Sequence, residues 1–228
     1  LNTVYTPGSG DIAAGFAVLT LTGTGNSPCF TPATDTVILS IVKKPTATLG
    51  VDKIVCEGPV NVYSNIQNAG SIKWLINGGS GSFVDATVSS PIYNPDPILD
   101  KDKSITFTVE VTPSNSCGPV VTDSVIYKVN ANPVVIAGGN STICETQPTF
   151  NVTSTIQYTD SVVWTSTGSG SFDNANAEDP IYTFSPGDIA VGSVTFTITG
   201  KKFGCPDVTD TMTVTIRKNP ITNITSVN

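Results

Sequence analysis

Hydrophobic and polar residues alternate through most of this sequence, and the alternating stretches come in pairs. One pair has apolar residues at every second position of 105–111 and again at 125–129. Successive side chains of a β-strand point to opposite faces, so a period of two predicts strands with one buried face. The apolar members of this pair and of two similar pairs are Ala17, Leu19, Leu21, Val37, Leu39, Ile41, Ile105, Phe107, Val109, Val111, Val125, Tyr127, Val129, Val194, Phe196, Ile198, Met212, Val214 and Ile216.

Helical spacing is rare in this sequence. No segment has apolar residues at i, i+3 and i+4 over three turns. The nearest is Ser185-Pro-Gly-Asp188, where a serine followed three residues later by an acid predicts a cap on one helical turn, and Asp11 and Gly15 hold the matching places earlier. The pattern therefore predicts an all-β fold, and in the middle of the chain the predicted strands are 46–51, 60–65, 72–76, 82–84, 105–111 and 125–129.

The predicted strands recur because the sequence is a tandem repeat. Trp164-Thr-Ser-Thr-Gly-Ser-Gly-Ser-Phe172, followed by Pro180-Ile-Tyr182, repeats Trp74-Leu-Ile-Asn-Gly-Gly-Ser-Gly-Ser-Phe83, followed by Pro91-Ile-Tyr93. A fixed period indicates a string of domains. Cys29, Cys117 and Cys205 lie 88 residues apart, as do Cys56 and Cys144. This period is close to the ~100 residues of an immunoglobulin-like sandwich.

We therefore expect about seven strands in each sandwich and divide the chain into four parts. Repeat one is the C-terminal half of a sandwich at 1–45, repeat two is 46–133, repeat three is 134–220, and a further repeat starts at 221–228. Because Tyr5 matches Tyr93 and Tyr182, we expect the sequence to be an internal piece of something longer. The connections are short and contain proline, which predicts a semi-rigid rod.

Within each complete repeat, the tryptophan and the Gly-Ser-Gly after it form the most distinctive stretch. We expect Trp74 and Trp164 to lie in the cores, and the glycines to give the backbone freedom for a tight hairpin. A phosphate-binding loop is the alternative, but it needs a following helix and usually a lysine. Neither is present in this sequence.

Composition and charge limit the classes of partner that we expect this chain to bind. Charged residues make up 13% of the chain, the net charge is −7 and the pI is about 4.4. Nucleic acid and anionic membranes attract clustered lysine and arginine, so we expect neither as a partner. No apolar run approaches the ~20 residues needed to cross a bilayer, so we expect no membrane insertion in this segment.

Five cysteines at fixed repeat positions indicate disulfides in an oxidising compartment. The first-to-second cysteine spacing of 61 residues does not match zinc motifs, and the sequence has no histidine. We expect Cys56 to bond Cys117 and Cys144 to bond Cys205, with the partner of Cys29 lying upstream.

The rival pairing joins Cys29 to Cys56 and Cys117 to Cys144. We favour the first because the last strand of a repeat, about 33 Å long, should carry the chain away from the second cysteine before the next repeat begins.

The sequence lacks the groups of residues that histidine-dependent enzymes use in catalysis. Without histidine, Ser-His-Asp and Cys-His systems and the usual zinc hydrolase sites are excluded. The acids fall in predicted turns rather than across a cleft, so we expect no enzyme and no cofactor. Asp96, Asp100 and Asp102 offer oxygen ligands for calcium as an alternative, but the neighbouring lysines favour a solvated turn.

Aromatic residues outside the predicted cores are the candidates for ligand contact. Phe30 and Phe203 flank cysteines, and Tyr63 and Tyr158 are further candidates. Exposed loop aromatics favour binding, for example of carbohydrate. The alternative, which we favour, is that they pack over the disulfide.

The repeats resemble the PKD-like or immunoglobulin-like modules of very large surface proteins of Bacteroidota, including adhesins of gliding flavobacteria exported by the type IX system. The resemblance covers the whole chain and rests on Trp164–Phe172, on Tyr182-Thr-Phe-Ser-Pro-Gly-Asp-Ile-Ala-Val-Gly192 and on its echo Tyr5-Thr-Pro-Gly-Ser-Gly-Asp-Ile-Ala-Ala-Gly15. Repeat two departs from the pattern in its Asp/Pro-rich loop, 94–102, and at Leu75-Ile76.

The resemblance implies an extracellular, cell-surface location and a non-catalytic spacer of an adhesin or filament, in gliding motility or cell adhesion. Neighbouring repeats are then the direct partners, and a surface polysaccharide or abiotic surface is bound by other parts of the protein. The alternative is a carbohydrate-binding accessory module of a secreted polysaccharide-degrading enzyme, with Phe30 and Phe203 as contacts.

The resemblance also implies O-glycosylation, which in that phylum occurs at Asp-Ser/Thr followed by an apolar residue. The matching hydroxyls are Thr36, Ser124, Thr211 and Ser161. Strand alternation should point the hydroxyls of the last strands outward. The alternative is that Asp-Ser/Thr marks only a turn at the start of a strand.

Overall fold

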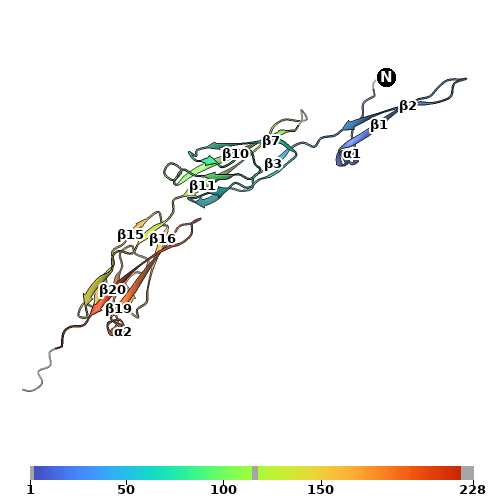
Figure 1. Ribbon diagram of the computed structural model, residues 1–228. Helices are drawn as coiled ribbons and strands as arrows, with labels where there is room; N and C mark the ends of the chain where they lie inside the picture. The colour runs from blue at the N-terminus through green and yellow to red at the C-terminus, as the bar shows by residue number, and fades with distance from the viewer. Residues whose placement is uncertain (1–2, 115–117, 222–228) are drawn as a thin grey trace, which may run out of the picture.

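The computed structural model describes residues 3–114 and 118–221, and these residues are almost entirely β (Figure 1). The predicted further repeat lies outside the described residues except for Ile221. Repeat one contains α1 (Ser9–Ala14) and a hairpin of β1 (Phe16–Gly23) and β2 (Ala33–Ser40).

Repeats two and three have the same succession of strands, and repeat three adds a helix before its last two strands. In repeat two these are β3 (Thr46–Thr48), β4 (Lys53–Cys56), β5 (Val60–Asn61), β6 (Asn65–Gln67), β7 (Ala69–Asn77), β8 (Ser82–Phe83), β9 (Ile92–Asn94), β10 (Lys103–Pro113) and β11 (Val121–Asn130). In repeat three they are β12 (Val134–Ile136), β13 (Ser141–Cys144), β14 (Thr149–Asn151), β15 (Thr155–Gln157), β16 (Ser161–Ser166), β17 (Ser171–Phe172), β18 (Ile181–Thr183), α2 (Pro186–Val191), β19 (Ser193–Lys201) and β20 (Val208–Arg217).

Each complete repeat is an immunoglobulin-like sandwich, as predicted. In repeat two the four-stranded sheet β4-β11-β10-β7 packs against β3-β6 and β5-β9-β8, and in repeat three β13-β20-β19-β16 packs against β12-β15 and β14-β18-β17. The described residues of repeat two form nine strands where seven were expected. One reason is that the first strand is split where Gly50 (φ 87°) turns the chain from one sheet to the other, and Gly138 (φ 82°) does the same in repeat three.

The predicted apolar faces form the cores of these two sandwiches. The inward residues of β10 and β11, and of β19 and β20, are at most 4% exposed. Trp74 and Trp164 are 5% and 2% exposed, so the prediction that they lie in the cores is confirmed. Aromatic rings surround them: Phe83 lies 5.7 Å from Trp74, and Phe172 lies 6.1 Å from Trp164, between ring centroids.

Repeat one differs because its hairpin lacks a facing sheet within the described residues. Ala17 is buried, but Val37 and Leu21 are 61% and 76% exposed, although alternation predicted them on a buried face. The corresponding strands of repeats two and three are covered by strands from the earlier part of the same repeat. Alternation predicts which face is apolar, whereas burial also needs a second sheet.

The Gly-Ser-Gly stretch is not a hairpin. β7 and β8 belong to different sheets, as do β16 and β17, so the loop crosses from one sheet to the other. Gly168 and Gly170 lie outside the left-handed region; a Cβ on them would approach Asp188 Oδ1 to 2.6 Å and the Thr183 carbonyl to 2.2 Å, respectively. These glycines allow close packing rather than an unusual backbone angle.

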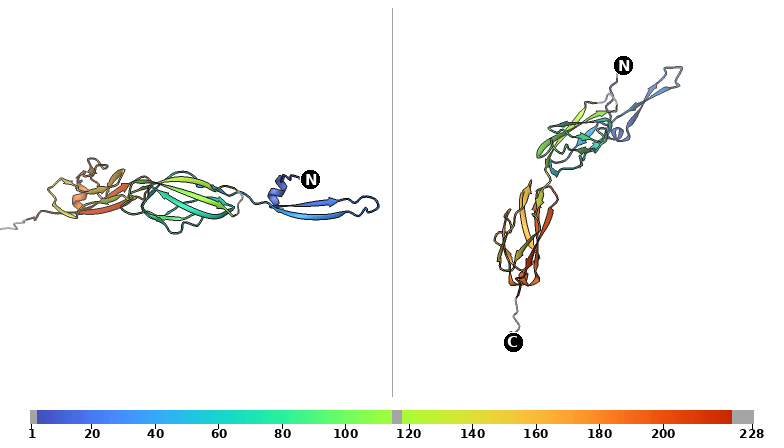
Figure 2. Two further views of the ribbon diagram at one scale, coloured as in Figure 1. Left: turned by 90° about the horizontal axis from the view of Figure 1, so that it is seen from above. Right: turned by 60° about the vertical axis from the view of Figure 1, so that its left-hand side comes forward.

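The connection between β19 and β20 lies against the end of repeat two at which β4 and β11 finish (Figures 1 and 2). β4 runs parallel to β11, so Cys56 lies opposite Asn130, the last residue of that strand. This arrangement places the start of β20 and the end of β4 at a common junction.

Candidate functional site: the junction between repeats

A buried aspartate holds the glycine loop of each complete repeat. Asp188 is 2% exposed and accepts hydrogen bonds from the amides of Ser169 (2.7 Å), Gly170 (3.0 Å) and Ser185 (2.9 Å). The hydroxyl of Tyr182 donates a further bond to Asp188 at 3.1 Å. Ser185 also caps α2 through its hydroxyl, which confirms the predicted capping box.

Repeat two holds its loop in the same way. Asp100 is 0% exposed and accepts hydrogen bonds from the amides of Ser80 (2.6 Å), Gly81 (3.0 Å) and Asp96 (2.9 Å), and from the Tyr93 hydroxyl (2.6 Å). The predicted solvated turn is therefore wrong at Asp100, because an ionised carboxylate can be buried where several N–H and O–H donors surround it.

The same pair occurs in repeat one, where Tyr5 donates to Asp11 at 2.6 Å. Asp96 and Asp102, the other two residues considered for calcium, accept backbone N–H bonds. Within residues 3–114 and 118–221, no group of three or more acidic or cysteine side chains is arranged to hold a metal ion. Calcium binding stays an untested prediction.

The hydrogen bonds determine the charge of these aspartates. Burial raises the pKa of Asp188, but bonds from Ser185, Ser169 and Tyr182 outweigh it, so the pKa is lowered overall. The same balance lowers the pKa of Asp100. Burial raises the pKa of the tyrosine partners, so each pair is an ionised aspartate with a neutral tyrosine at neutral pH.

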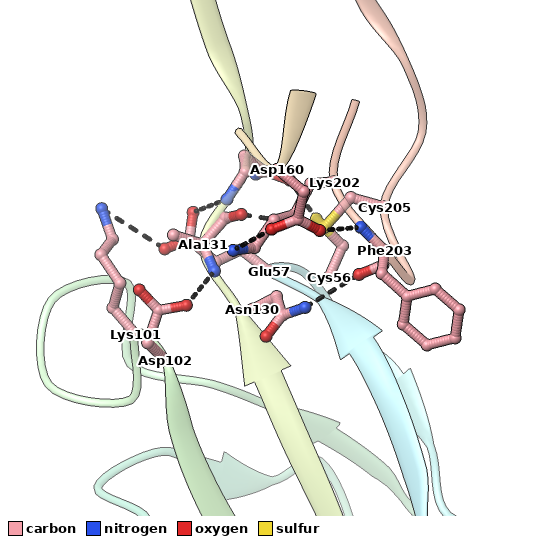
Figure 3. Close-up of a disulfide and its surroundings, with 11 residues drawn as sticks. Cys56, Glu57, Lys101, Asp102, Asn130, Ala131, Asp160, Lys202, Phe203 and Cys205 are labelled. Atoms are coloured by element: carbon pink, nitrogen blue, oxygen red, sulfur yellow. Dashed lines mark hydrogen bonds and ion pairs between the residues drawn. A yellow bond between two sulfur atoms is a disulfide. The ribbon is translucent and has the colours of Figure 1, made fainter. Parts of the chain in front are cut away.

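One disulfide joins repeat two to repeat three. Cys56 bonds Cys205, with their Cα atoms 4.9 Å apart (Figure 3). Cys29 and Cys144 are free and exposed, and Cys117 lies outside the described residues. The predicted bonds Cys56–Cys117 and Cys144–Cys205 are therefore wrong, and so is the rival bond Cys29–Cys56.

The error lies in where the first cysteine of a repeat sits. Cys144 ends β13, which runs parallel to β20 and lies opposite its last residue, Arg217. Cys205 precedes the first residue of β20, so the ten-residue strand, about 33 Å long, separates the two cysteines. A disulfide needs Cα atoms within about 7 Å, so Cys144 and Cys205 cannot bond each other within repeat three.

Polar and cationic contacts accompany the disulfide. The Asn130 side-chain amide donates to the Phe203 carbonyl at 2.8 Å (Figure 3). The Lys101 ammonium lies 4.7 Å from the ring centroid of Tyr158. Gly204, at φ +79°, packs on repeat two so closely that a Cβ would lie 3.0 Å from Cγ2 of Ile54. The junction is thus a packed interface.

The linker between the repeats is also held in place. Ala131 and Pro133 are buried. The Ala131 amide donates to Asp102 at 3.2 Å, and the Asn132 amide donates to Glu57 at 3.4 Å. Both acceptors belong to repeat two, which fixes the direction in which the chain leaves that repeat.

Phe203 and Phe30, the predicted ligand contacts, are 72% and 71% exposed. Figure 3 shows the Phe203 ring pointing away from the disulfide, so the expectation that it packs over the bond is wrong. The ring borders a shallow hollow of about 650 Å³ at the junction. The hollow is lined by Asp52, Lys53, Ile54, Ile126, Lys128, Phe203 and Gly204.

The four candidate glycosylation hydroxyls, Thr36, Ser124, Thr211 and Ser161, are all on exposed residues. Three of the aspartates before them have a structural role that differs from a turn at a strand start, because they lie inside β2, β11 and β20. Asp123 accepts a bond from the Leu49 amide at 2.8 Å, and Asp210 accepts one from the Ala137 amide at 2.9 Å. Glycosylation stays a prediction.

Among the described residues, neither α1 nor α2 has the length and apolar character needed to cross a bilayer.

No protein-family model matches the chain, and no curated protein matches it. Many solved structures do. The insect immune protein hemolin has a TM-score of 0.48 and 12% identity over 87% of this chain and 56% of that chain. Mouse Cadherin-23 EC22-24 has a TM-score of 0.39 and 16% identity over 92% of this chain and 77% of that chain. The PKD domain of the KIAA 1837 protein has a TM-score of 0.33 and 18% identity over 39% of this chain and 92% of that chain. These likenesses concern the β-sandwich fold and carry no argument about function.

Proposed function

We propose that this chain is a non-catalytic spacer of a long cell-surface adhesin or filament. Its repeats would project a binding tip from an extracellular surface, and other parts of the protein would bind a surface polysaccharide or an abiotic surface. The resemblance to Bacteroidota adhesins suggests export by the type IX system and a part in gliding motility. The observation that carries the proposal is the Cys56–Cys205 disulfide between successive repeats.

Two covalent connections at one junction restrict motion more than one does. The linker alone leaves a repeat free to swivel about a few backbone angles. A second attachment at Cys205, together with the packing of Gly204 on Ile54, opposes that rotation. A spacer that holds a tip away from a cell needs this resistance to bending. Disulfides persist in oxidising compartments, which supports the extracellular location.

Small-angle X-ray scattering tests the spacer. We expect the oxidised chain to scatter as an extended particle and the Cys205→Ser variant to show a broader range of conformations. Cys29→Ser is the matched control, because Cys29 forms no bond in this chain, and it should scatter like the parent. A folded-back oxidised chain, with repeats two and three side by side, would contradict the proposal.

A second candidate function is carbohydrate binding at the junction. The exposed Phe203 ring beside Ile54, Lys53 and Lys128 offers an apolar face with polar groups around it, which suits a sugar ring. A glycan array distinguishes the two functions. Binding of a defined polysaccharide that is lost in Phe203→Ala, but kept in Phe30→Ala, would replace the spacer proposal; no binding by the parent chain would support the spacer.

A further inference from the structure

We propose that the end of repeat three is a receptor for the hairpin of another repeat of this kind, and that Cys144 forms a disulfide with that repeat's second cysteine. The occupant is thus a repeat whose β19–β20-type connection carries a cysteine in the place of Cys205. The inference comes from the geometry of the observed junction and does not depend on the spacer function.

Cys144 occupies the same structural position as Cys56. Each ends a short strand, β13 or β4, that runs parallel to the last strand of its repeat. Cys56 lies opposite Asn130, and Cys144 lies opposite Arg217. The thiol of Cys144 is therefore carried at the exit end of repeat three, where the next repeat of a tandem array would begin.

The backbone around the two cysteines is also the same. The Glu57 amide donates to the Asn130 carbonyl at 3.0 Å, and the Glu145 amide donates to the Arg217 carbonyl at 2.9 Å. The side chain of each glutamate then accepts a bond from the linker. Asn132 donates to Glu57 at 3.4 Å, and Asn219 donates to Glu145 at 2.8 Å.

The two ends differ in what covers them. Asn130 is 4% exposed, and Cys56 is half-buried, because the hairpin of repeat three lies on them. Their counterparts Arg217 and Cys144 are exposed. Asn130 donates a hydrogen bond to the Phe203 carbonyl. Arg217, at the equivalent position of repeat three, also has a side chain that can donate hydrogen bonds. The end of repeat three therefore has the frame and the donor of a junction.

The proposed occupant has a known form in this chain. Cys205 lies in the connection between β19 and β20, and Cys29 lies in the connection between β1 and β2, 176 residues or two repeat periods earlier. Cys29 is exposed and free. The first cysteine of each repeat would then bond forward to the next repeat, and the second cysteine would bond backward to the preceding one.

The bond forms by thiol–disulfide exchange, with a small disulfide or a disulfide oxidoreductase as oxidant. The Cys144 thiolate attacks one sulfur of the oxidant, and one thiol leaves. The partner cysteine thiolate then attacks the mixed disulfide at the Cys144 sulfur and displaces the second thiol. Two cysteine thiols are oxidised, one disulfide is reduced to two thiols, and the protons pass to these thiols.

The test uses an extended chain in which a second copy of residues 134–220 follows Pro220. The copy is then preceded by a proline, as Val134 is preceded by Pro133 in the parent chain. The protein is oxidised with a mixture of reduced and oxidised glutathione, and its peptides are mapped without reduction. We expect one cross-linked pair from Cys56 and Cys205, and a second from Cys144 and the second cysteine of the added copy.

Cys144→Ser is the control, and in it the second cysteine of the added copy should become free. A second extension with residues 46–133 guards against an added copy that does not fold; in it Cys144 should bond the copied Cys117. Urea unfolding identifies the extended chains that are folded. A folded extended chain in which Cys144 stays free, or bonds Cys205, would overturn the proposal.

Discussion

A buried ionised aspartate in each complete repeat connects three parts of the sandwich that are separate in sequence. Asp188 accepts hydrogen bonds from the glycine loop, from the Ser185 amide at the start of α2 and from the Tyr182 hydroxyl. Such a group is stable only while its donors remain in place, since a buried carboxylate without partners is costly. The conformation of the loop thus depends on a single side chain.

We predict that Asp188→Asn destabilises repeat three by about 3 kcal/mol, because the amide turns two N–H donors toward groups that are donors themselves. Urea unfolding followed by tryptophan fluorescence measures it. Trp164 reports repeat three, and Trp74 reports repeat two as an internal reference. The control is Asp207→Asn. Asp207 forms an exposed ion pair with Lys201, so its loss should change the free energy of unfolding by less than about 0.5 kcal/mol. Equal effects of the two substitutions would contradict the prediction.

The lowered pKa values of Asp100 and Asp188 predict a pH dependence of stability. The unfolded chain binds the protons more tightly, so the stabilisation is complete above the unfolded pKa of about 3.9 and is lost as the pH falls through the lower folded pKa. We expect the urea midpoint of repeat three to be level from about pH 5 to 7 and to fall below about pH 4. The urea midpoint should fall less steeply below pH 4 in Asp188→Asn. If it falls as steeply as in the parent chain, protonation of Asp188 is not the cause.

At the scale of elements, the Gly-Ser-Gly loop requires glycine for a different reason from the backbone freedom that the sequence suggests. The loop passes directly over Tyr182 and Asp188 on its way between the two sheets, and a side chain on it would occupy their space. Steric exclusion, more than backbone freedom, requires glycine at positions 168 and 170. The pairing of β17 with β18 depends on this close approach.

We predict that Gly170→Ala destabilises repeat three by about 2 to 3 kcal/mol, because the new Cβ would lie 2.2 Å from the Thr183 carbonyl oxygen. Gly139→Ala is the matched control in the same repeat. A Cβ there meets no atom within 4 Å, so its effect should stay within about 0.5 kcal/mol. Thermal unfolding of both variants tests the pair, and a similar loss in both would show that close packing is not the cause.

At the scale of the whole molecule, the disulfide changes the path along which a pulling force travels. Force applied at the two ends passes from Cys56 directly to Cys205, so the chain between them carries no load. Most of repeats two and three lies in this bypassed segment, including both tryptophans. A chain pulled from its two ends would then resist extension through covalent bonds rather than through the folding stability of each sandwich.

Single-molecule pulling between the ends tests this load path. The bond bypasses a sequence separation of 149 residues, so adding a reductant should release about 500 Å of additional contour length. Cys56→Ser should show the longer extension with or without reductant. If the parent extends to its full length under oxidising conditions, the load does not pass through the disulfide.

The local features of this protein were determined by sequence alone. Alternation in β10, β11, β19 and β20 predicted the buried faces because the period of two is a property of the strand itself. The 88-residue period predicted equivalent elements in the two complete repeats, and the spacing of Ser185 and Asp188 predicted the capped turn of α2. Alternation and capping involve neighbours in the chain, and the period is found by comparing one stretch of sequence with another, so none of these signals requires knowing how the sheets pack.

The tertiary structure decided which distant residues meet. A spacing cannot show that β4 runs parallel to β11, and only this pairing carries Cys56 to the exit end of its repeat and into reach of Cys205. Likewise, Asp100 appears in the sequence as one acid of a polar loop, and its burial follows from the donors that the folded loop directs at it. Contacts across sheets and across repeats depend on the end of the sandwich at which each strand finishes, which is a property of the packed domain.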